Sequence, residues 1–166
     1  RAVEITAEMY QAALAAMRPG STEQAVVGAM QGAWSARGAQ YSFPPIVSVR
    51  GQILHNIAHS GTLREGQLLL IDSGAESPGG YAGDITRTYP VTGRFDARQK
   101  AVYETVLRAQ KEAIAACVPG RPFREIHLLA ARVLAEGLRE IGLIRGAVED
   151  VVAEGAHALF FPHGLG

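Results

Sequence analysis

Apolar residues recur at the three- and four-residue spacing of an amphipathic helix in four long stretches of the chain and one short one. The predicted helices cover residues 1–17, 21–38, 96–118, 126–141 and 147–156. Pro-Gly pairs at 19–20 and 119–120 would end the first and third helices, since proline cannot continue a helix and glycine favours its end. Ser21 followed by Gln24 resembles a capping box, which predicts that the second helix opens there.

The two Pro-Gly pairs belong to a short internal sequence repeat. The segments "AAMRPG" at 15–20 and "AACVPG" at 115–120 lie 100 residues apart, each between two predicted helices. The repeat suggests a duplicated half-domain with pseudo-two-fold symmetry. The alternative is a helix-stop pattern that occurs twice by chance. Both readings remain open from sequence alone.

Strand formers dominate the part of the chain between the second and third helices. Strands are expected at "PIVSV", at "QILHN" and in a hairpin made of "LLLID" and "YAGDITRTYPV", and a further strand is expected to begin in "ALFFPHGLG". Helices and strands in this order predict an α/β (α+β) fold class.

The hairpin places two aspartates on either side of its Ser-Pro-Gly-Gly turn. If the turn is centred on Pro78, Asp72 lies opposite Asp84 and Leu70 lies opposite Thr86, all on one face of the sheet. Directly opposed residues have Cβ atoms roughly 5 Å apart, and like charges there are destabilising. Either one carboxyl group keeps its proton or a cation lies between the two.

Hard divalent cations prefer carboxylate oxygens, so the pair predicts a metal site in which Thr86 orients a carboxylate. The structural alternative pairs the aspartates with Arg50 or Arg87. Arg87 follows a residue of the aspartate face, so its side chain should point to the other side of the sheet.

Composition narrows the class of protein. The 166 residues suit one domain with a substantial core, and 48% of them are hydrophobic with a formal net charge of zero, which argues against nucleic acid or an anionic membrane as the main partner. No apolar run approaches the ~18 residues of a membrane span, and no signal peptide is visible. One cysteine, Cys117, suits a reducing compartment such as the cytoplasm and is expected to be buried filler.

The histidines divide into two pairs. His55 lies at the end of a predicted strand, and His163 lies among glycines in "FPHGLG", where backbone can approach a ligand closely. We expect both to converge on the aspartates. His127 and His157 belong to helical stretches without chemical neighbours and are interpreted as structural.

The block from His55 to Phe95 resembles the metal-binding core of Xaa-Pro aminopeptidases and prolidases. With the two residues before His55 it reads "ILHNIAHSGTLREGQLLLIDSGAESPGGYAGDITRTYPVTGRF". These enzymes belong to the metallopeptidase family with the pita-bread fold, which methionine aminopeptidases and creatinase share. "FFPHGLG" is similar to the family's later histidine motif, and the likeness extends over essentially the whole chain. The resemblance implies a pita-bread catalytic domain over residues 1–166, incomplete at both ends and lacking the C-terminal strands that carry further metal ligands.

The resemblance also implies roles for single residues. Asp72 would chelate one metal ion and Asp84 would bridge two, while His55 and His163 would line the substrate site as catalytic residues. Thr86 would support the metal ligands. The family's site holds two divalent ions, with manganese expected first and cobalt or zinc as alternatives, and takes one histidine and two glutamates that lie beyond Gly166.

The sequence therefore predicts a metal-dependent exopeptidase that removes the residue before proline, as an Xaa-Pro aminopeptidase or dipeptidase. Its substrate would be a peptide with proline at the second position, and the complete protein would form a homodimer or higher homo-oligomer. The alternatives are a methionine aminopeptidase, a creatinase-like hydrolase and a non-catalytic binding module of the same fold.

Overall fold

The computed structural model describes residues 1–165 of the chain. Its helices are α1 (Ala2–Ala16), α2 (Glu23–Ala36), α3 (Ala97–Ala116), α4 (Phe123–Glu140), α5 (Val148–Ala153) and the 3₁₀ helix η1 (Ala156–Leu159). Its strands are β1 (Gln40–Tyr41), β2 (Ile46–Ser48), β3 (Leu68–Ser73), β4 (Ala75–Glu76) and β5 (Ile85–Pro90). Among the described residues, no helix combines the length and the apolar character that crossing a lipid bilayer requires.

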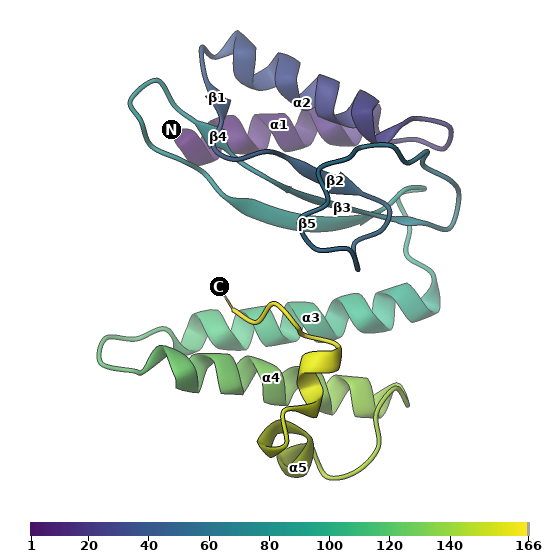
Figure 1. Cartoon of the computed structure of the whole chain (residues 1–166), viewed down its shortest axis with the longest axis vertical. Helices are drawn as coiled ribbons and strands as arrows, with labels where there is room; N and C mark the ends of the chain where they lie inside the picture. The colour runs from purple at the N-terminus through teal and green to yellow at the C-terminus, as the bar shows by residue number, and fades with distance from the viewer. Residues whose placement is uncertain (166) are drawn as a thin grey trace. The chain divides into compact units, whose positions relative to one another are not determined.

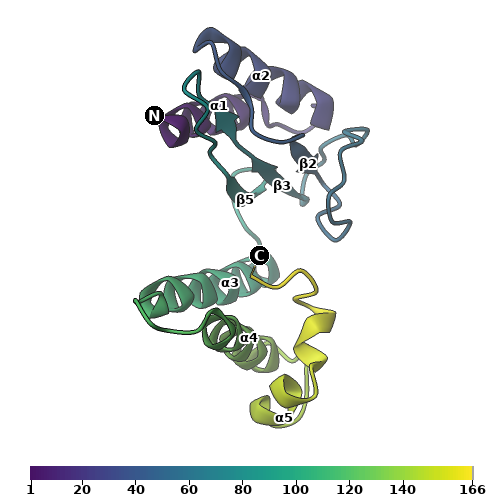
Figure 2. The same cartoon turned by 60° about the vertical axis from the view of Figure 1, so that its left-hand side comes forward.

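The chain forms two compact units, Arg1–Phe95 and Asp96–Gly166. In the first unit, α1 and α2 both lie on one face of an antiparallel sheet with the strand order β2-β3-β5 (Figures 1 and 2). The core between helices and sheet is built mainly from buried side chains, and the largest that are fully buried are Met9, Met30, Leu63, Leu69 and Ile71. The second unit is helical, with α3 packed along α4.

The two helix pairs are built alike. Pro-Gly separates α1 from α2 and α3 from α4, as predicted, and Gly20 and Gly120 both have positive φ, 90° and 84°. Each unit thus begins with a helix, a Pro-Gly turn and a second helix. The first helix pair covers a sheet, whereas the second is followed by α5 and η1.

Helix α3 begins at the predicted residue, whereas α2 begins one residue later than predicted. Asp96 caps α3 with a complete capping box: its carboxylate accepts from the Gln99 backbone N–H at 2.8 Å, and the Gln99 side chain accepts from the Asp96 N–H at 3.0 Å. For α2 the N-cap is Thr22, not Ser21, because the Thr22 hydroxyl accepts from the backbone N–H of Ala25. The Ser21 hydroxyl instead donates to the Ala16 carbonyl at the end of α1.

The hairpin register is shifted by two residues relative to the predicted one. Asp72 pairs with Thr86 and Leu70 pairs with Thr88, so the turn is centred on Gly79 and not on Pro78. The reason is a three-residue loop: the Gly80 N–H donates to the Ser77 carbonyl, and Gly80 then adopts a positive φ of 78°. The sequence pattern does not reveal that the loop comprises residues 78–80, so the centre of the turn moves by one residue and each strand partner by two.

Two predicted strands are absent from the described residues. Residues 51–60, including "QILHN", form turns and an irregular loop, and residues 158–165 of "ALFFPHGLG" form the end of η1 followed by a turn and bends, while Gly166 lies outside the described residues. Both segments contain proline, glycine or consecutive polar groups that interrupt a ladder of backbone hydrogen bonds. Cys117 was expected to be buried, but it is exposed at the C-terminal end of α3, where its thiol donates to the Ala113 carbonyl.

Candidate metal centre

Strands β3 and β5 carry two carboxylates that approach each other. Leu69 and Ile71 of β3 lie in the core with residues of α1 and α2, so Asp72, which alternates with them, lies on the face of the sheet turned away from these helices. Asp72 lies in β3 opposite Thr86, and Asp84 precedes β5. Because side chains alternate along a strand, Asp84 lies on the same face as Thr86 and diagonal to Asp72. The predicted convergence of the two carboxylates on one face is confirmed, although they are not directly opposed.

The electrostatics of the pair favour a cation. The pKa of Asp84 is raised from its ordinary value, first by burial and then by the charge of Asp72 and a hydrogen bond with it. The Thr86 hydroxyl donates to Asp72 Oδ1 at 2.8 Å, which fixes one of the two carboxylates. Among residues 1–165, no lysine or arginine forms an ion pair with either aspartate.

The structural alternative for the aspartates therefore fails. Arg87 hydrogen-bonds the Thr86 carbonyl, and its charge acts on Tyr10, a residue of the helix that covers the other face of the sheet. The repulsion between Asp72 and Asp84 is thus not relieved by arginine, and their oxygens fit a divalent metal ion. No group of three or more His, Cys, Asp or Glu side chains with metal-binding geometry occurs among residues 1–165.

Tyr10 supports the site from behind the sheet. Its hydroxyl, on α1, lies within hydrogen-bonding distance of the Ile71 carbonyl, at 3.0 Å, and of the Ile85 carbonyl. These two residues are the chain neighbours of Asp72 and Asp84. Burial, followed by the charge of Asp72, raises the pKa of the Tyr10 hydroxyl, so it stays a proton donor. One buried side chain therefore ties together the two strands at the carboxylates.

A close backbone approach narrows the hairpin just beyond the carboxylates. A Cβ added to Gly74 would lie 1.7 Å from the Gly83 carbonyl oxygen, so glycine is required at position 74. The Ser42 hydroxyl donates to the same carbonyl at 2.7 Å. The segment that leads into Asp84 is thereby held against the end of β3.

His55 lies in the loop at 50–60, and this loop covers part of the carboxylate face. Ser48 and Leu70 are paired on that face, two residues along β3 from Asp72. A Cβ on Gly51 would be 3.3 Å from the Leu70 side chain, and Asn56, next to His55, donates to the Ser48 hydroxyl at 3.3 Å. The loop that carries His55 is therefore anchored on the same face as the aspartates.

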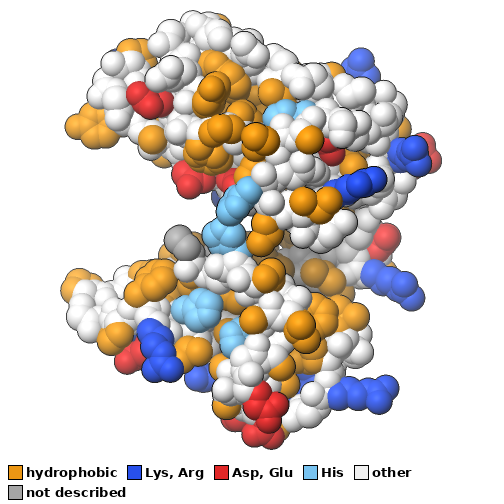
Figure 3. Space-filling model, viewed as in Figure 1, with side chains coloured by type: hydrophobic (Ala, Val, Ile, Leu, Met, Phe, Trp, Pro, Cys, Tyr) orange, Lys and Arg blue, Asp and Glu red, His pale blue; other side chains and the backbone are white. Residues whose placement is uncertain are grey.

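The same loop exposes large hydrophobic side chains. Ile53, Leu54 and Ile57 are 45%, 48% and 58% exposed, and hydrophobic side chains reach the surface of both units in Figure 3. His59, also in the loop, points inward and donates from Nε2 to the Pro45 carbonyl at 2.7 Å. His59 thus has an anchoring role, whereas the His55 ring belongs to the exposed part of the loop.

His163 lies in the second unit, in the bends that follow η1. Its predicted convergence with the aspartates stays a prediction. His127 and His157 do have chemical neighbours, contrary to expectation: their ring centroids lie 6.2 Å apart, and His127 stacks on Phe161 at 5.5 Å. The His127 Nδ1 also accepts from the Leu165 N–H at 3.4 Å, so this histidine braces the segment that contains His163.

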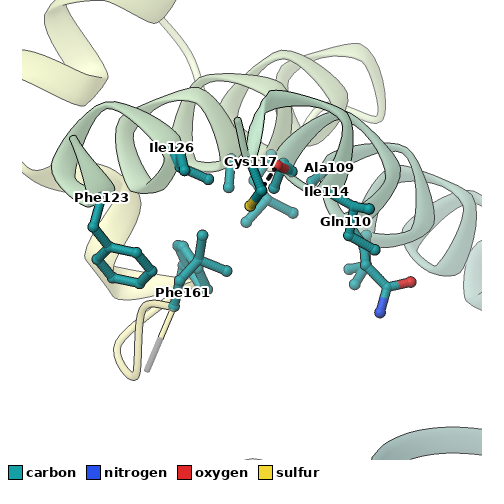
Figure 4. A pocket seen from close by; sticks show the side chains of 12 residues that line it. Ala109, Gln110, Ile114, Cys117, Phe123, Ile126 and Phe161 are labelled. Atoms are coloured by element: carbon teal, nitrogen blue, oxygen red, sulfur yellow. Dashed lines mark hydrogen bonds between the residues drawn. The ribbon is translucent and has the colours of Figure 1, made fainter. Parts of the chain in front are cut away.

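The second unit also holds an apolar hollow of ≈ 440 Å³ between α3 and α4 (Figure 4). Its lining contains no carboxylate and no histidine, which distinguishes it from the carboxylate site. The lining residues are Val106, Ala109, Gln110, Ala113, Ile114, Cys117, Phe123, Ile126, Ala130, Leu134, Phe161 and Leu165.

Two supporting residues escaped the sequence analysis. Tyr10 has no sequence pattern that sets it apart from other core residues of α1. Glu23 does have a distinguishing sequence pattern. A carboxylate is common at the first position of a helix, but Glu23 also occupies an apolar position of the helical repeat, where a buried carboxylate needs a partner. Glu23 is in fact 2% exposed.

Comparison with known proteins gives the site its context. The chain is 38% identical to the Xaa-Pro aminopeptidase of Escherichia coli K12 over 168 residues, which is 99% of this chain and 38% of the relative. It is 42% identical over 113 residues to Xaa-Pro aminopeptidase 1 of Streptomyces coelicolor, covering 68% of this chain and 23% of the relative. The chain thus spans well under half the length of the curated relatives that it matches.

Solved structures agree with these relatives. A substrate complex of an E. coli aminopeptidase P variant superposes with a TM-score of 0.95 at 38% identity, covering 99% of this chain and 38% of that one. Proline aminopeptidase P II from Yersinia pestis superposes with a TM-score of 0.94 at 40% identity and the same coverage. The predicted resemblance and the α/β pita-bread fold class are thereby confirmed for this part of the fold. Metallopeptidase family M24 matches residues 1–166, and the chain therefore belongs to that family.

Proposed function

We propose that the complete protein is a metal-dependent Xaa-Pro aminopeptidase, and that residues 1–166 are an incomplete part of its catalytic domain. The single observation that carries this proposal is the pair Asp72 and Asp84, which lie against each other and form no ion pair with a lysine or arginine of the described residues. Membership of family M24 and the Xaa-Pro aminopeptidases among its relatives support the same activity.

Two of the metal ligands would come from this chain. Asp72 would chelate one ion, Asp84 would bridge two, and Thr86 would keep its hydrogen bond to Asp72 so that the other carboxylate oxygen faces the ion. When bound, divalent ions supply an activated water and polarise the carbonyl of the peptide bond. Manganese is the ion we propose first, with cobalt or zinc as alternatives; a zinc-substituted aminopeptidase P is among the similar structures.

The histidines would act on the substrate. His55, on the loop anchored to the carboxylate face, would donate a hydrogen bond to the carbonyl oxygen as negative charge develops there. His163 would hold the substrate near the scissile bond. The substrate would be a peptide with proline at its second position, and the complete protein would be a cytoplasmic homodimer or higher homo-oligomer.

The test uses the full-length protein with Mn²⁺. Peptides with proline at the second position should be hydrolysed, and Asp84→Ala should lower the rate by more than about 100-fold, which exceeds the loss typical of an outer ligand partner. Glu65→Ala, an exposed carboxylate of the same unit, is the control and should leave the rate unchanged. Faster hydrolysis of peptides with N-terminal methionine and no proline would favour a methionine aminopeptidase, and turnover of creatine would favour a creatinase-like enzyme.

A further inference from the structure

A buried carboxylate connects the two ends of the loop that carries His55. Glu23, the first residue of α2, is 2% exposed. Its Oε1 accepts from the backbone N–H of Val49 at 2.8 Å, and its Oε2 accepts from the backbone N–H of Gly61 at 2.7 Å. Val49 directly precedes the loop at 50–60 and Gly61 directly follows it.

The backbone around Glu23 completes this attachment. The Glu23 N–H donates to the Gly61 carbonyl at 2.9 Å, so the carboxylate and the backbone of one residue both bond to Gly61. A Cβ on Gly61 would lie 2.5 Å from Glu23 Oε1, so a larger residue at position 61 would have to displace the carboxylate. The N-terminus of α2 also favours a negative charge at this position.

The loop between these ends needs such support. It contains two non-glycine residues in the left-handed region, His55 with φ 55° and His59 with φ 44°. Conformations of this kind persist only where the surrounding structure holds them. The loop has no helix or strand of its own, and three of its hydrophobic side chains are about half exposed. Its conformation therefore depends on a few polar anchors.

We propose that Glu23 is a positioning residue that sets the placement of His55 over the carboxylate face. The expected effect of Glu23 on catalysis rests on the function proposed above. Its role in anchoring the loop at 50–60 does not depend on that function. Both oxygens are needed, since each accepts from a different end of the loop. A glutamine at this position would present an amide N–H₂ to one of the two backbone donors, and an aspartate would be too short to reach both.

The experiment is made on the full-length protein with Glu23→Gln. We expect amide hydrogen exchange within residues 49–61 to become at least about tenfold faster. With Xaa-Pro peptides, kcat should fall by about 10- to 100-fold while KM changes by less than about twofold, because a misplaced His55 affects the transition state more than binding. Gly61→Ala displaces the same carboxylate without changing its charge and should give the same pattern.

A double variant provides the matched control. Glu23→Gln combined with Gln24→Glu keeps a carboxylate in the first turn of α2 at an exposed position, so the helix keeps its favourable charge but the loop lacks its acceptor. If kcat and exchange return to the original values in this variant, Glu23 acts only through the helix and the proposal is overturned. Unchanged exchange at 49–61 in Glu23→Gln would overturn it as well.

The two readouts separate the inference from the proposed function. Faster exchange in a protein that hydrolyses no peptide would support the anchoring role of Glu23 and reject the peptidase. Faster exchange with unchanged kcat in an active peptidase would show that the loop does not position His55, and would overturn the proposal.

Discussion

Asp72 makes its neighbour Asp84 in the candidate centre harder to ionise. Asp84 has the raised pKa, owing to burial and to the nearby charge of Asp72. A carboxyl group whose folded pKa lies above its unfolded value binds more protons in the folded state. Its contribution therefore favours folding below about pH 4, the usual range for unfolded aspartate, and is lost as the pH rises through the folded pKa.

The pH dependence of the Asp84 contribution to stability leads to a prediction for the metal-free protein. Asp84→Asn should raise the melting temperature at pH 7 while it removes peptidase activity, because it abolishes the repulsion from Asp72 without requiring a proton or a metal ion. The gain should shrink as the pH is lowered towards 4. Thermal unfolding of both proteins between pH 4 and 8 in chelator measures it, and a lower melting temperature for the variant at pH 7 would contradict the account.

Tyr10 permits a prediction that leaves the carboxylates in place. Tyr10→Phe removes only the hydroxyl between the Ile71 and Ile85 carbonyls, and should lower the free energy of unfolding by about 1 kcal/mol. Tyr81→Phe, at a tyrosine that is 77% exposed, should change it by much less. Denaturant unfolding of the two variants provides the comparison, and equal effects would show that the Tyr10 hydroxyl is not a specific strand tie.

At the level of elements, glycine allows α3 and α4 to approach closely. A Cβ on Gly137 would lie 2.3 Å from the Thr105 methyl group and 2.5 Å from its hydroxyl. Thr105 is buried, and its hydroxyl donates to the Ala101 carbonyl within α3. A side chain at position 137 would therefore force Thr105 to move or push α3 and α4 apart.

The same substitution should thus have opposite effects in two helices. Gly137→Ala should destabilise the protein by about 1–3 kcal/mol through overpacking, despite the higher helix propensity of alanine. Gly32→Ala in α2, where a Cβ would meet nothing within 4 Å, should stabilise it by up to about 1 kcal/mol. Denaturant titration measures both, and a stabilising Gly137→Ala would rule out the close contact.

The elements also show how far sequence reasoning reaches. Helix existence followed from apolar spacing and the Pro-Gly stops, which are local properties, and the face shared by Asp72 and Asp84 followed from strand alternation. The hairpin register did not, because the turn centre lies one residue further along the chain, at Gly79, which moves the partner of Asp72 by two residues, from Asp84 to Thr86. A carboxylate at an apolar helical position marks Glu23 as a residue that needs a buried partner, but the sequence does not show that this partner is the distant loop at 50–60.

At the level of the whole molecule, the chain covers 38% of the E. coli relative, and the two carboxylates are the metal ligands proposed within it. Two carboxylates leave most of a six-coordinate shell to water, so residues 1–166 alone should bind Mn²⁺ only weakly. Calorimetric titration of this chain and of the full-length protein measures the difference. Sub-micromolar binding by residues 1–166 would mean that other side chains of this chain, such as His55 or His163, complete the site.

The Tyr10 hydroxyl has a consequence for how ion preference can change. The separation of the two carboxylates depends on how closely β3 and β5 approach, and Tyr10, a residue of α1 that is only 5% exposed, ties those strands together. Selection for a larger or smaller ion can thus operate through the hydrophobic core, without any exchange of ligands. An engineer who wishes to retune the metal should therefore vary the inner face of α1 before altering the aspartates.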